Sequence, residues 1–438
     1  MISRINAINF LYTYIMVITI SILSYLMYLF QIQGTNEYMG MQYINILRLE
    51  NISIFIFLSF LVTILLPKDN IKPSSIFIGI YLIFVIMWNI SLFSVAGKLD
   101  YIETIFKIYI LIFPVIFLYI IKYFIYNDFL YKILFPYINA KKFNIIALIL
   151  ILVTAGILGY FVMGGGSFDF NSSYVRRMAG RENFGTGTLY SYLFAMSLNG
   201  IAPILAFIGL YRRNIYLVVI SLFFSIFAFW LIGTKAPMFY VVLMGILGYL
   251  VSINREKNIL SFFLLALLFI NILSLLEYLI FDFSIIADIF TRRAIAVVTQ
   301  NQSYFIDFFF QHNSISDFLF GTHQDKPITF VIGELYYDSQ TANINTNTFL
   351  YTLLQKGFYG YLISIVVISL FFLLLDVFYE KYKIKEILAI AIMYSLLLCE
   401  QAYTTAFISS GIALIFILLV LFRRTNHINI GKEQCLVK

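Results

Sequence analysis

The sequence has few charged residues and few of the side chains that hold metals. Only 12% of its 438 residues are charged, it contains two cysteines and three histidines, and 62% of its residues are hydrophobic. Soluble domains carry about 25% charged residues. The shortage of charge therefore excludes an ordinary soluble domain, and a mean hydropathy of +0.93 indicates an integral membrane protein.

The motifs of metal, redox and nucleotide sites are missing as well. There is no C-x-x-C, no cysteine–histidine cluster with zinc spacing, no G-x-x-x-x-G-K-[ST], and no G-x-G-x-x-G in a strand–helix context. Cys399 lies in an apolar run and Cys435 in the C-terminal tail, so neither is placed for an extracytoplasmic disulfide. We therefore expect no metal and no other cofactor.

Long apolar runs are what the sequence has instead. A membrane-spanning helix needs about 20 mostly apolar residues, because backbone polar groups in hydrocarbon must be satisfied within the segment. The runs are continuous rather than alternating, which favours helices over barrel strands. We predict an all-α polytopic protein, with a single transmembrane domain over residues 1–438. About twelve spans are predicted, at residues 8–30, 52–67, 76–96, 106–126, 144–163, 188–210, 215–232, 238–253, 259–281, 358–379, 387–404 and 408–423.

The lysines and arginines predict how these spans are oriented. Short cytoplasmic loops keep basic residues, whereas translocated loops do not. With the N-terminus inside, the predicted inner segments hold 18 of the 29 basic residues, and the outer segments hold 15 of the 22 acidic ones. We therefore predict that both termini are cytoplasmic. The net charge of +7 then reflects topology, and we expect no nucleic-acid partner.

One group of basic residues lies on the predicted outer side. Segment 164–187 is predicted to be an Arg-rich outer loop, with Arg176, Arg177 and Arg181 within six positions. The glycines at 164–166 allow a sharp turn where the chain leaves the membrane. An arginine fork suits phosphate bidentately, so the loop is a candidate anion site. The alternative is a solvated loop that contacts lipid phosphates.

A second outer basic residue, Lys235, lies in the five-residue link GTKAP at 233–237. Gly233 and Pro237 keep the two flanking helices from joining. An ionisable residue embedded in a membrane domain is costly and usually faces a partner or a cavity. We therefore expect Lys235 to face a cavity. The alternative is that its ammonium group extends to the lipid headgroups.

The segment from about 282 to 345 is predicted to be one large outer loop. A loop of this length rarely lacks secondary structure, so we expect short helices within it. Residues 284–310 have apolar side chains at helical spacing, with Arg292 and Arg293 in the middle. This pattern predicts a helix that lies on the membrane surface or over a cavity.

Residues 345–360, NTNTFLYTLLQKGFYG, lead from this loop into the tenth predicted span. Gly357 and Gly360 allow a close helix contact. Asn345 and Asn347 suit hydrogen bonds to a polyhydroxyl ligand. Capping of the following helix is the alternative role, and we assign it to Asn347.

The arrangement of these features resembles a known family. About twelve spans, a large outer loop late in the chain, arginine-bearing outer loops, a G-T-K turn and the pattern N-x-x-L-x-x-L-x-x-x-G-x-x-G are similar to the bacterial O-antigen polymerase and ligase superfamily. The resemblance covers roughly residues 150–380, and it is closest to Wzy-type polymerases of oligosaccharide repeat units. Ligases usually place a histidine before the asparagine of the pattern, where this chain has Thr346, so polymerase is favoured.

The resemblance implies a GT-C-like architecture and a glycosyltransferase of the bacterial cytoplasmic membrane, with an active site that faces the periplasm or cell exterior. It implies glycans linked to undecaprenyl diphosphate as donor and acceptor, and O-antigen or capsular polysaccharide as the product. Membrane lipid and a chain-length regulator protein are the other partners that it implies. A flippase for lipid-linked oligosaccharides, or another transporter, and an O-antigen ligase are the alternatives.

This chemistry selects the candidate site residues. An acceptor hydroxyl attacks an anomeric carbon while a diphosphate departs, so the site needs cations and a carboxylate. Because the cations are fixed charges of the protein, the reaction needs no metal. The candidate catalytic residues are Arg176, Lys235, Arg292 and Glu334, with Asp338, His323 and Glu400 as further possible bases. The candidate substrate-binding residues are Arg177, Arg181, Arg293, Asn345, Asn347 and Tyr336. For Glu334 the alternative is an ordinary solvated carboxylate, and for Tyr336 a place in the interfacial aromatic belt.

Overall fold

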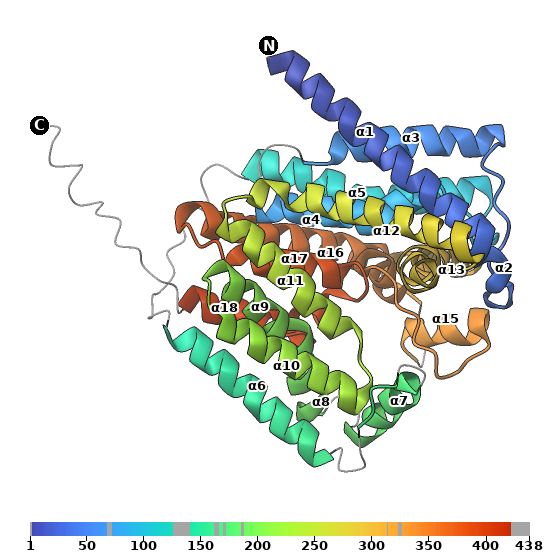
Figure 1. The fold of residues 1–438 in the computed structure, drawn as a ribbon. Coiled ribbons are helices and arrows are strands. Elements are labelled where there is room, and N and C mark those ends of the chain that lie inside the picture. The colour runs from blue at the N-terminus through green and yellow to red at the C-terminus, as the bar shows by residue number, and fades with distance from the viewer. Residues whose placement is uncertain are drawn as a thin grey trace, which may run out of the picture. The chain divides into compact units, whose positions relative to one another are not determined.

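Every regular element in the part of the chain that the structure describes is a helix (Figure 1). The computed structural model describes residues 2–67, 72–125, 141–161, 166–169, 172–184, 188–312, 314–322 and 326–421. Within these residues the prediction of an all-α fold is confirmed. Packing divides the chain into two compact units: unit 1 comprises residues 1–130, 254–377 and 391–406, and unit 2 comprises 131–253, 378–390 and 407–438.

Seven helices among the described residues are long and apolar enough to cross a membrane: Ile8–Thr35, Pro73–Ile90, Tyr101–Phe124, Leu189–Tyr211, Ile215–Ile232, Glu256–Phe281 and Thr348–Lys381. Five shorter apolar helices accompany them: Leu49–Leu65, Ile145–Ile157, Ala236–Ser252, Ile328–Tyr337 and Ile387–Leu398. The chain is therefore built as a polytopic membrane protein. The count of twelve spans and the cytoplasmic termini stay predictions.

Unit 1 is built around the helix that begins at Pro73. Its helices are α1 (Ile2–Met27), α2 (Gln33–Thr35), α3 (Leu49–Leu65), α4 (Pro73–Tyr81), α5 (Tyr101–Ile125), α12 (Ile259–Phe281), α13 (Val297–Gln311), α14 (Ile315–Phe320), α15 (Ile328–Tyr337), α16 (Thr348–Lys381, of which the part up to Val377 belongs to this unit) and most of α17 (Ile387–Leu398). Every residue of α4 is buried, and a π-helical turn, Leu82–Ile86, and a 3-10 turn, Met87–Ile90, continue it. A helix that is apolar on all sides belongs inside a bundle, which explains this central position.

A helix is present over most of residues 284–310, which were predicted to lie on the membrane surface or over a cavity. Its first half exposes Ile285 and Ile289, whereas its second half is buried. A π-helix, Ala287–Ala296, continues directly into α13, and residues 299–306 are all buried inside unit 1. The sequence here is polar, T-Q-N-Q-S at 299–303, and each polar side chain makes hydrogen bonds in the interior. Hydrogen bonds within the helix for Thr299 and Ser303, and to distant segments for the other three, therefore offset the cost of burying these groups.

Helix α16 consists of two segments joined at Gly357, whose φ of 64° and ψ of −170° are not helical. The helix begins ten residues before the apolar run predicted from 358. Beside the kink, the carbonyl oxygen of Leu354 accepts hydrogen bonds from the backbone N–H of Thr322 (3.0 Å) and from its hydroxyl (3.2 Å). These hydrogen bonds thus attach α16, just before its kink, to the residues that follow α14.

Unit 2 contains α6 (Lys141–Phe161), α7 (Ser173–Phe184), α8 (Leu189–Ala195), α9 (Ala202–Tyr211), α10 (Ile215–Ile232), α11 (Ala236–Ser252) and α18 (Ile412–Leu421). A π-helix, Met196–Ile201, joins α8 to α9, and α9 packs against both α10 and α11. The contact with α11 is close at Gly248, where a Cβ atom would lie 2.3 Å from the carbonyl oxygen of Phe207.

Segment 164–187, predicted to be an Arg-rich loop, contains helix α7. The sequence SYVRRMAGRENF is polar and holds a glycine, so its own propensity for helix is modest. Gly180 lies inside the helix, and it faces Ile232 of α10 so closely that a Cβ atom would be 2.9 Å from that side chain. Packing on α10 therefore accounts for a helix that local pattern does not predict.

Candidate functional site

Two basic features that are separate in the sequence meet at one end of unit 2. The backbone N–H of Ser167 donates to the carbonyl oxygen of Trp230 in α10 (3.0 Å). At the start of α7, Ser173 lies against Gly233, where a Cβ atom would be 2.3 Å from the Ser173 carbonyl oxygen. The segment that carries the arginines is therefore in direct contact with the G-T-K turn.

The G-T-K turn holds Lys235 close to the end of α10. Gly233 ends α10 with a φ of 78°, and its N–H donates to the carbonyl oxygen of Phe229 (2.8 Å). Only Gly among the standard residues adopts this backbone without strain, which explains its use here. Lys235 is the residue directly before α11 and is half-buried. Because Lys235 is only two residues after Gly233, its backbone is held near the end of α10.

Arg176 is positioned by three neighbours. Its Nη1 donates to Ser172 Oγ (2.7 Å), its Nη2 donates to the carbonyl oxygen of Asp169 (3.1 Å), and its guanidinium carbon lies 5.9 Å from the centre of the Phe229 ring. The Nε atom is buried and has no hydrogen-bond partner among the described residues, and the same is true of the Thr234 hydroxyl oxygen. Buried polar groups are generally satisfied, so each of these two atoms is a candidate contact for a further group.

We name Arg176, Arg177 and Lys235 the α7 basic cluster. Arg177 is exposed on α7. The backbone of Arg181 belongs to the same helix, but its side chain lies outside the described residues. A guanidinium fork held in place, with a lysine on the turn that its segment contacts, is suited to an anion with several oxygens, such as a phosphate.

The remaining predicted cations lie in unit 1, where Arg292 already has a partner. Its Nε and Nη2 donate to the two carboxylate oxygens of Asp288, at 2.6 and 3.0 Å. Arg293 is exposed. The charge of Arg292 is thus balanced within its own helix. The i, i+4 spacing of Asp288 and Arg292 is the sequence signal that indicates this pair.

The predicted base, Glu334, lies at the surface of unit 1. Its carboxylate pairs with Lys326 at 3.1 Å, and the two side chains are 42% and 54% exposed. Exposed ion pairs of this kind contribute about 0–1 kcal/mol. This environment favours the solvated carboxylate over a tuned base. Of the other candidates, Asp338 and Glu400 are exposed, and His323 lies outside the described residues.

Tyr336 belongs to a tyrosine cluster between α13 and α15. Its ring stacks on Tyr304 with centroids 4.4 Å apart, and Tyr337 meets Tyr304 edge-on at 5.5 Å. The Tyr336 hydroxyl donates to Asp307 (2.6 Å), and burial together with this carboxylate raises the pKa of Tyr336. One face of the Tyr336 ring is therefore covered by protein, and Asp307 is a half-buried carboxylate that sequence patterns do not single out.

The two asparagines of the opening of α16 have different environments. Asn345 is exposed, and its carbonyl oxygen accepts from Asn301 Nδ2 (3.0 Å). Asn347 is fully buried, and its Oδ1 accepts from the backbone N–H groups of Phe349 (3.1 Å) and Leu350 (3.2 Å). This geometry confirms the predicted N-cap.

Replacing Asn347 with alanine should lower the free energy of unfolding by about 1 kcal/mol, because the cap hydrogen bonds are lost. Asn347→Ser retains a side-chain acceptor and should recover part of that loss. Thermal unfolding of the purified protein in detergent measures the difference. Equal melting temperatures for the alanine and serine variants would show that the cap contributes little.

Two buried charged residues inside candidate spans were not singled out from the sequence. Lys107 of α5 is fully buried and donates to the carbonyl oxygen of Phe93 (2.5 Å) and to Ser303 Oγ (3.1 Å). Asp376 of α16 is also fully buried, and its carboxylate accepts from the backbone N–H (2.8 Å) and hydroxyl (2.6 Å) of Ser74, in the first turn of α4. Buried charges within spans are a feature of transport pathways and of structural contacts alike.

Comparison of the chain with protein-family models, with curated proteins and with solved structures finds no match in any of the three. The resemblance to the polymerase and ligase superfamily therefore rests on the sequence features alone.

Proposed function

We propose that the protein is a glycosyltransferase that polymerises oligosaccharide repeat units linked to undecaprenyl diphosphate, on the outer side of the bacterial cytoplasmic membrane. The observation that supports it best is the α7 basic cluster, in which the segment that carries Arg176 contacts the turn that carries Lys235. Arg176 Nε and the Thr234 hydroxyl are buried without a hydrogen-bond partner among the described residues. A diphosphate leaving group needs such a concentration of positive charge.

In the proposed reaction, a hydroxyl oxygen of the acceptor glycan forms a bond to the anomeric carbon of the donor glycan. The bond from that carbon to the diphosphate oxygen breaks, and the diphosphate keeps the electron pair. Arg176 and Lys235 stabilise the negative charge that develops on the leaving oxygen. The hydroxyl proton passes to a carboxylate base.

A deletion strain tests the proposal. Without the gene, we expect a single repeat unit on the final carrier, and the wild-type gene should restore a ladder of polymer on a gel. The readout is the distribution of chain lengths, because polymerisation alone changes chain length. A ladder that persists in the deletion strain would refute the polymerase proposal.

The same strain separates the alternatives. The buried Lys107 within a candidate span is the observation that favours a transporter. If the protein were a flippase, no repeat unit would reach the outer side in the deletion strain. If it were a ligase, polymer would accumulate on the lipid carrier and be missing from its final acceptor.

A further inference from the structure

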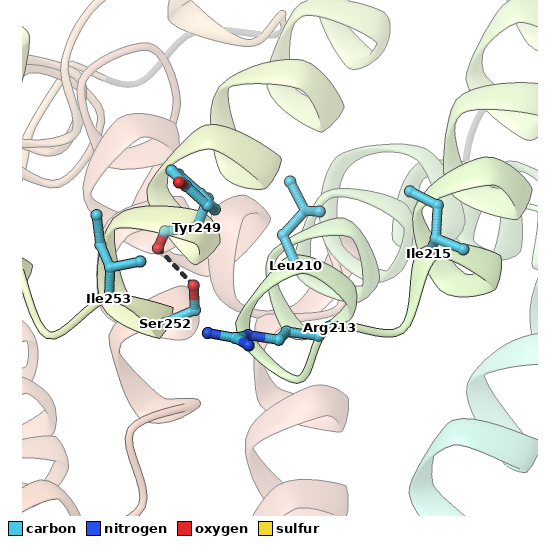
Figure 2. A pocket seen from close by; sticks show the side chains of 6 residues that line it. All are labelled: Leu210, Arg213, Ile215, Tyr249, Ser252 and Ile253. Atoms are coloured by element: carbon cyan, nitrogen blue, oxygen red, sulfur yellow. Dashed lines mark hydrogen bonds between the residues drawn. The ribbon is translucent and has the colours of Figure 1, made fainter.

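A pocket of about 300 Å³ lies between the α9–α10 turn and the end of α11 (Figure 2). All of its lining residues belong to unit 2: Leu210, Arg213, Ile215, Tyr249, Ser252 and Ile253. Figure 2 shows Arg213 extending toward Ser252, whose hydroxyl donates to the carbonyl oxygen of Tyr249 at 2.7 Å. The pocket thus combines one cation with aliphatic and aromatic walls.

Arg213 is held at this pocket by the backbone of the turn. The residue has a φ of 57°, in the left-handed region, and the next residue, Asn214, donates its N–H to the carbonyl oxygen of Gly209 (2.7 Å). This left-handed conformation is common at helix ends, and here it directs the chain from the end of α9 into α10. The turn therefore holds the backbone of Arg213 beside the pocket.

The neighbouring arginine provides a direct contrast. Arg212 donates from Nε (3.0 Å) and Nη2 (2.6 Å) to Glu386, so its charge is balanced within unit 2. Arg213 makes no side-chain hydrogen bond or ion pair with any residue that the structure describes. Of two adjacent arginines, one is neutralised and the other is available to a ligand.

The rim of the pocket is apolar and exposed. Ile215 is 56% exposed, Tyr249 is 54% exposed and Ile253 is 37% exposed. A free phosphate ion gains nothing from such a rim, whereas a lipid places its headgroup at the cation and its acyl chain along the apolar side chains. The mixture of one unpaired arginine and exposed apolar residues therefore selects an amphipathic anion.

We propose that this pocket binds an anionic phospholipid, with the headgroup phosphate on the Arg213 guanidinium and an acyl chain against Ile215 and Tyr249. The site is independent of the α7 basic cluster and of the proposed glycosyl transfer. The predicted topology places Arg213 on the cytoplasmic side, where anionic lipids attract basic residues next to membrane helices. The bound lipid would hold this surface of unit 2 at the inner leaflet.

Native mass spectrometry of the purified full-length protein tests this inference. Wild type, Arg213→Gln and Arg212→Gln are compared in detergent with added phosphatidylglycerol or phosphatidylcholine. The wild type should retain phosphatidylglycerol preferentially, and Arg213→Gln should lower that retention by about five- to tenfold, because one phosphate contact is lost. Arg212→Gln, which removes a charge that Glu386 already balances, should retain the lipid as the wild type does.

Three outcomes would overturn the inference. One is equal retention of phosphatidylglycerol by wild type and Arg213→Gln. Another is an equal loss in Arg212→Gln, which would indicate a general charge effect. The last is displacement of the lipid by excess inorganic phosphate, which would show a free-anion site. Melting temperatures equal to that of wild type establish that each variant is folded.

Discussion

Replacing Arg176 with alanine should reduce the yield of polymer by about 10²- to 10³-fold, the typical effect of removing one well-placed donor from a site that stabilises developing negative charge. Ser172 and the carbonyl oxygen of Asp169 hold two nitrogens of this guanidinium, while Nε is left for a ligand. Arg176→Lys should recover little activity, because an ammonium group lacks the planar fork. Lys235→Ala should have an effect of the same order.

The measurement is the density of polymer ladders in the deletion strain that carries each variant, at matched levels of membrane protein. Arg48→Ala is the control, since Arg48 is also basic and exposed on the predicted outer side but lies outside the α7 basic cluster. It should support wild-type ladders. A wild-type ladder from Arg176→Ala would remove the α7 basic cluster from the mechanism.

Replacing Gly357 with alanine should destabilise the protein by about 2–6 kcal/mol. The backbone at Gly357, with φ 64° and ψ −170°, lies in a region that only glycine occupies readily, and other residues pay about 1–3 kcal/mol there. A Cβ atom would also lie 2.4 Å from the backbone of Leu319 and Phe320, which adds about 1–3 kcal/mol of overpacking. The first segment of α16 should then separate from α14.

The matched control is Gly156→Ala in α6, where a Cβ atom meets nothing within 4 Å. Alanine in a helix is more favourable than glycine by about 0.5–1 kcal/mol, so this variant should be as stable as wild type or slightly more so. Thermal unfolding in detergent compares the two. The assignment of Gly357 as a strained contact would be wrong if both variants melted together with the wild type.

Local sequence signals predicted several of these features correctly. Continuous apolar runs of about the length of a bilayer-spanning helix indicated helical membrane elements, and α10, which occupies Ile215–Ile232, coincides with its predicted run. Asn347 before an apolar helical pattern predicted a cap, and the cap is present. The glycine of the G-T-K turn predicted the end of α10. Each of these depends on the residue itself and a few neighbours along the chain.

Features that depend on distant partners were predicted poorly. Helix α7 is polar and contains a glycine, and its contact with Ile232 and Gly233 supplies what its own propensity lacks. The helical spacing of apolar residues at 284–310 predicted a helix on the membrane surface or over a cavity. In the structure, Lys107 and Asn89 from other helices hydrogen-bond Ser303 and Gln302 in the interior. A sequence suggests that polar residues are exposed, because the hydrogen-bond partners that allow their burial are far away along the chain.

The sequence by itself determined that this is a helical membrane protein with basic groups in predicted outer segments, since hydrophobicity and charge act on each segment separately. Only the tertiary structure decided which segments with basic groups come into contact. Arg292 is neutralised by Asp288 one helical turn away, whereas Arg176 is brought by packing of α7 on α10 to the turn that carries Lys235. The physical reason is that electrostatic pairing depends on distance in space, which the order of residues does not specify.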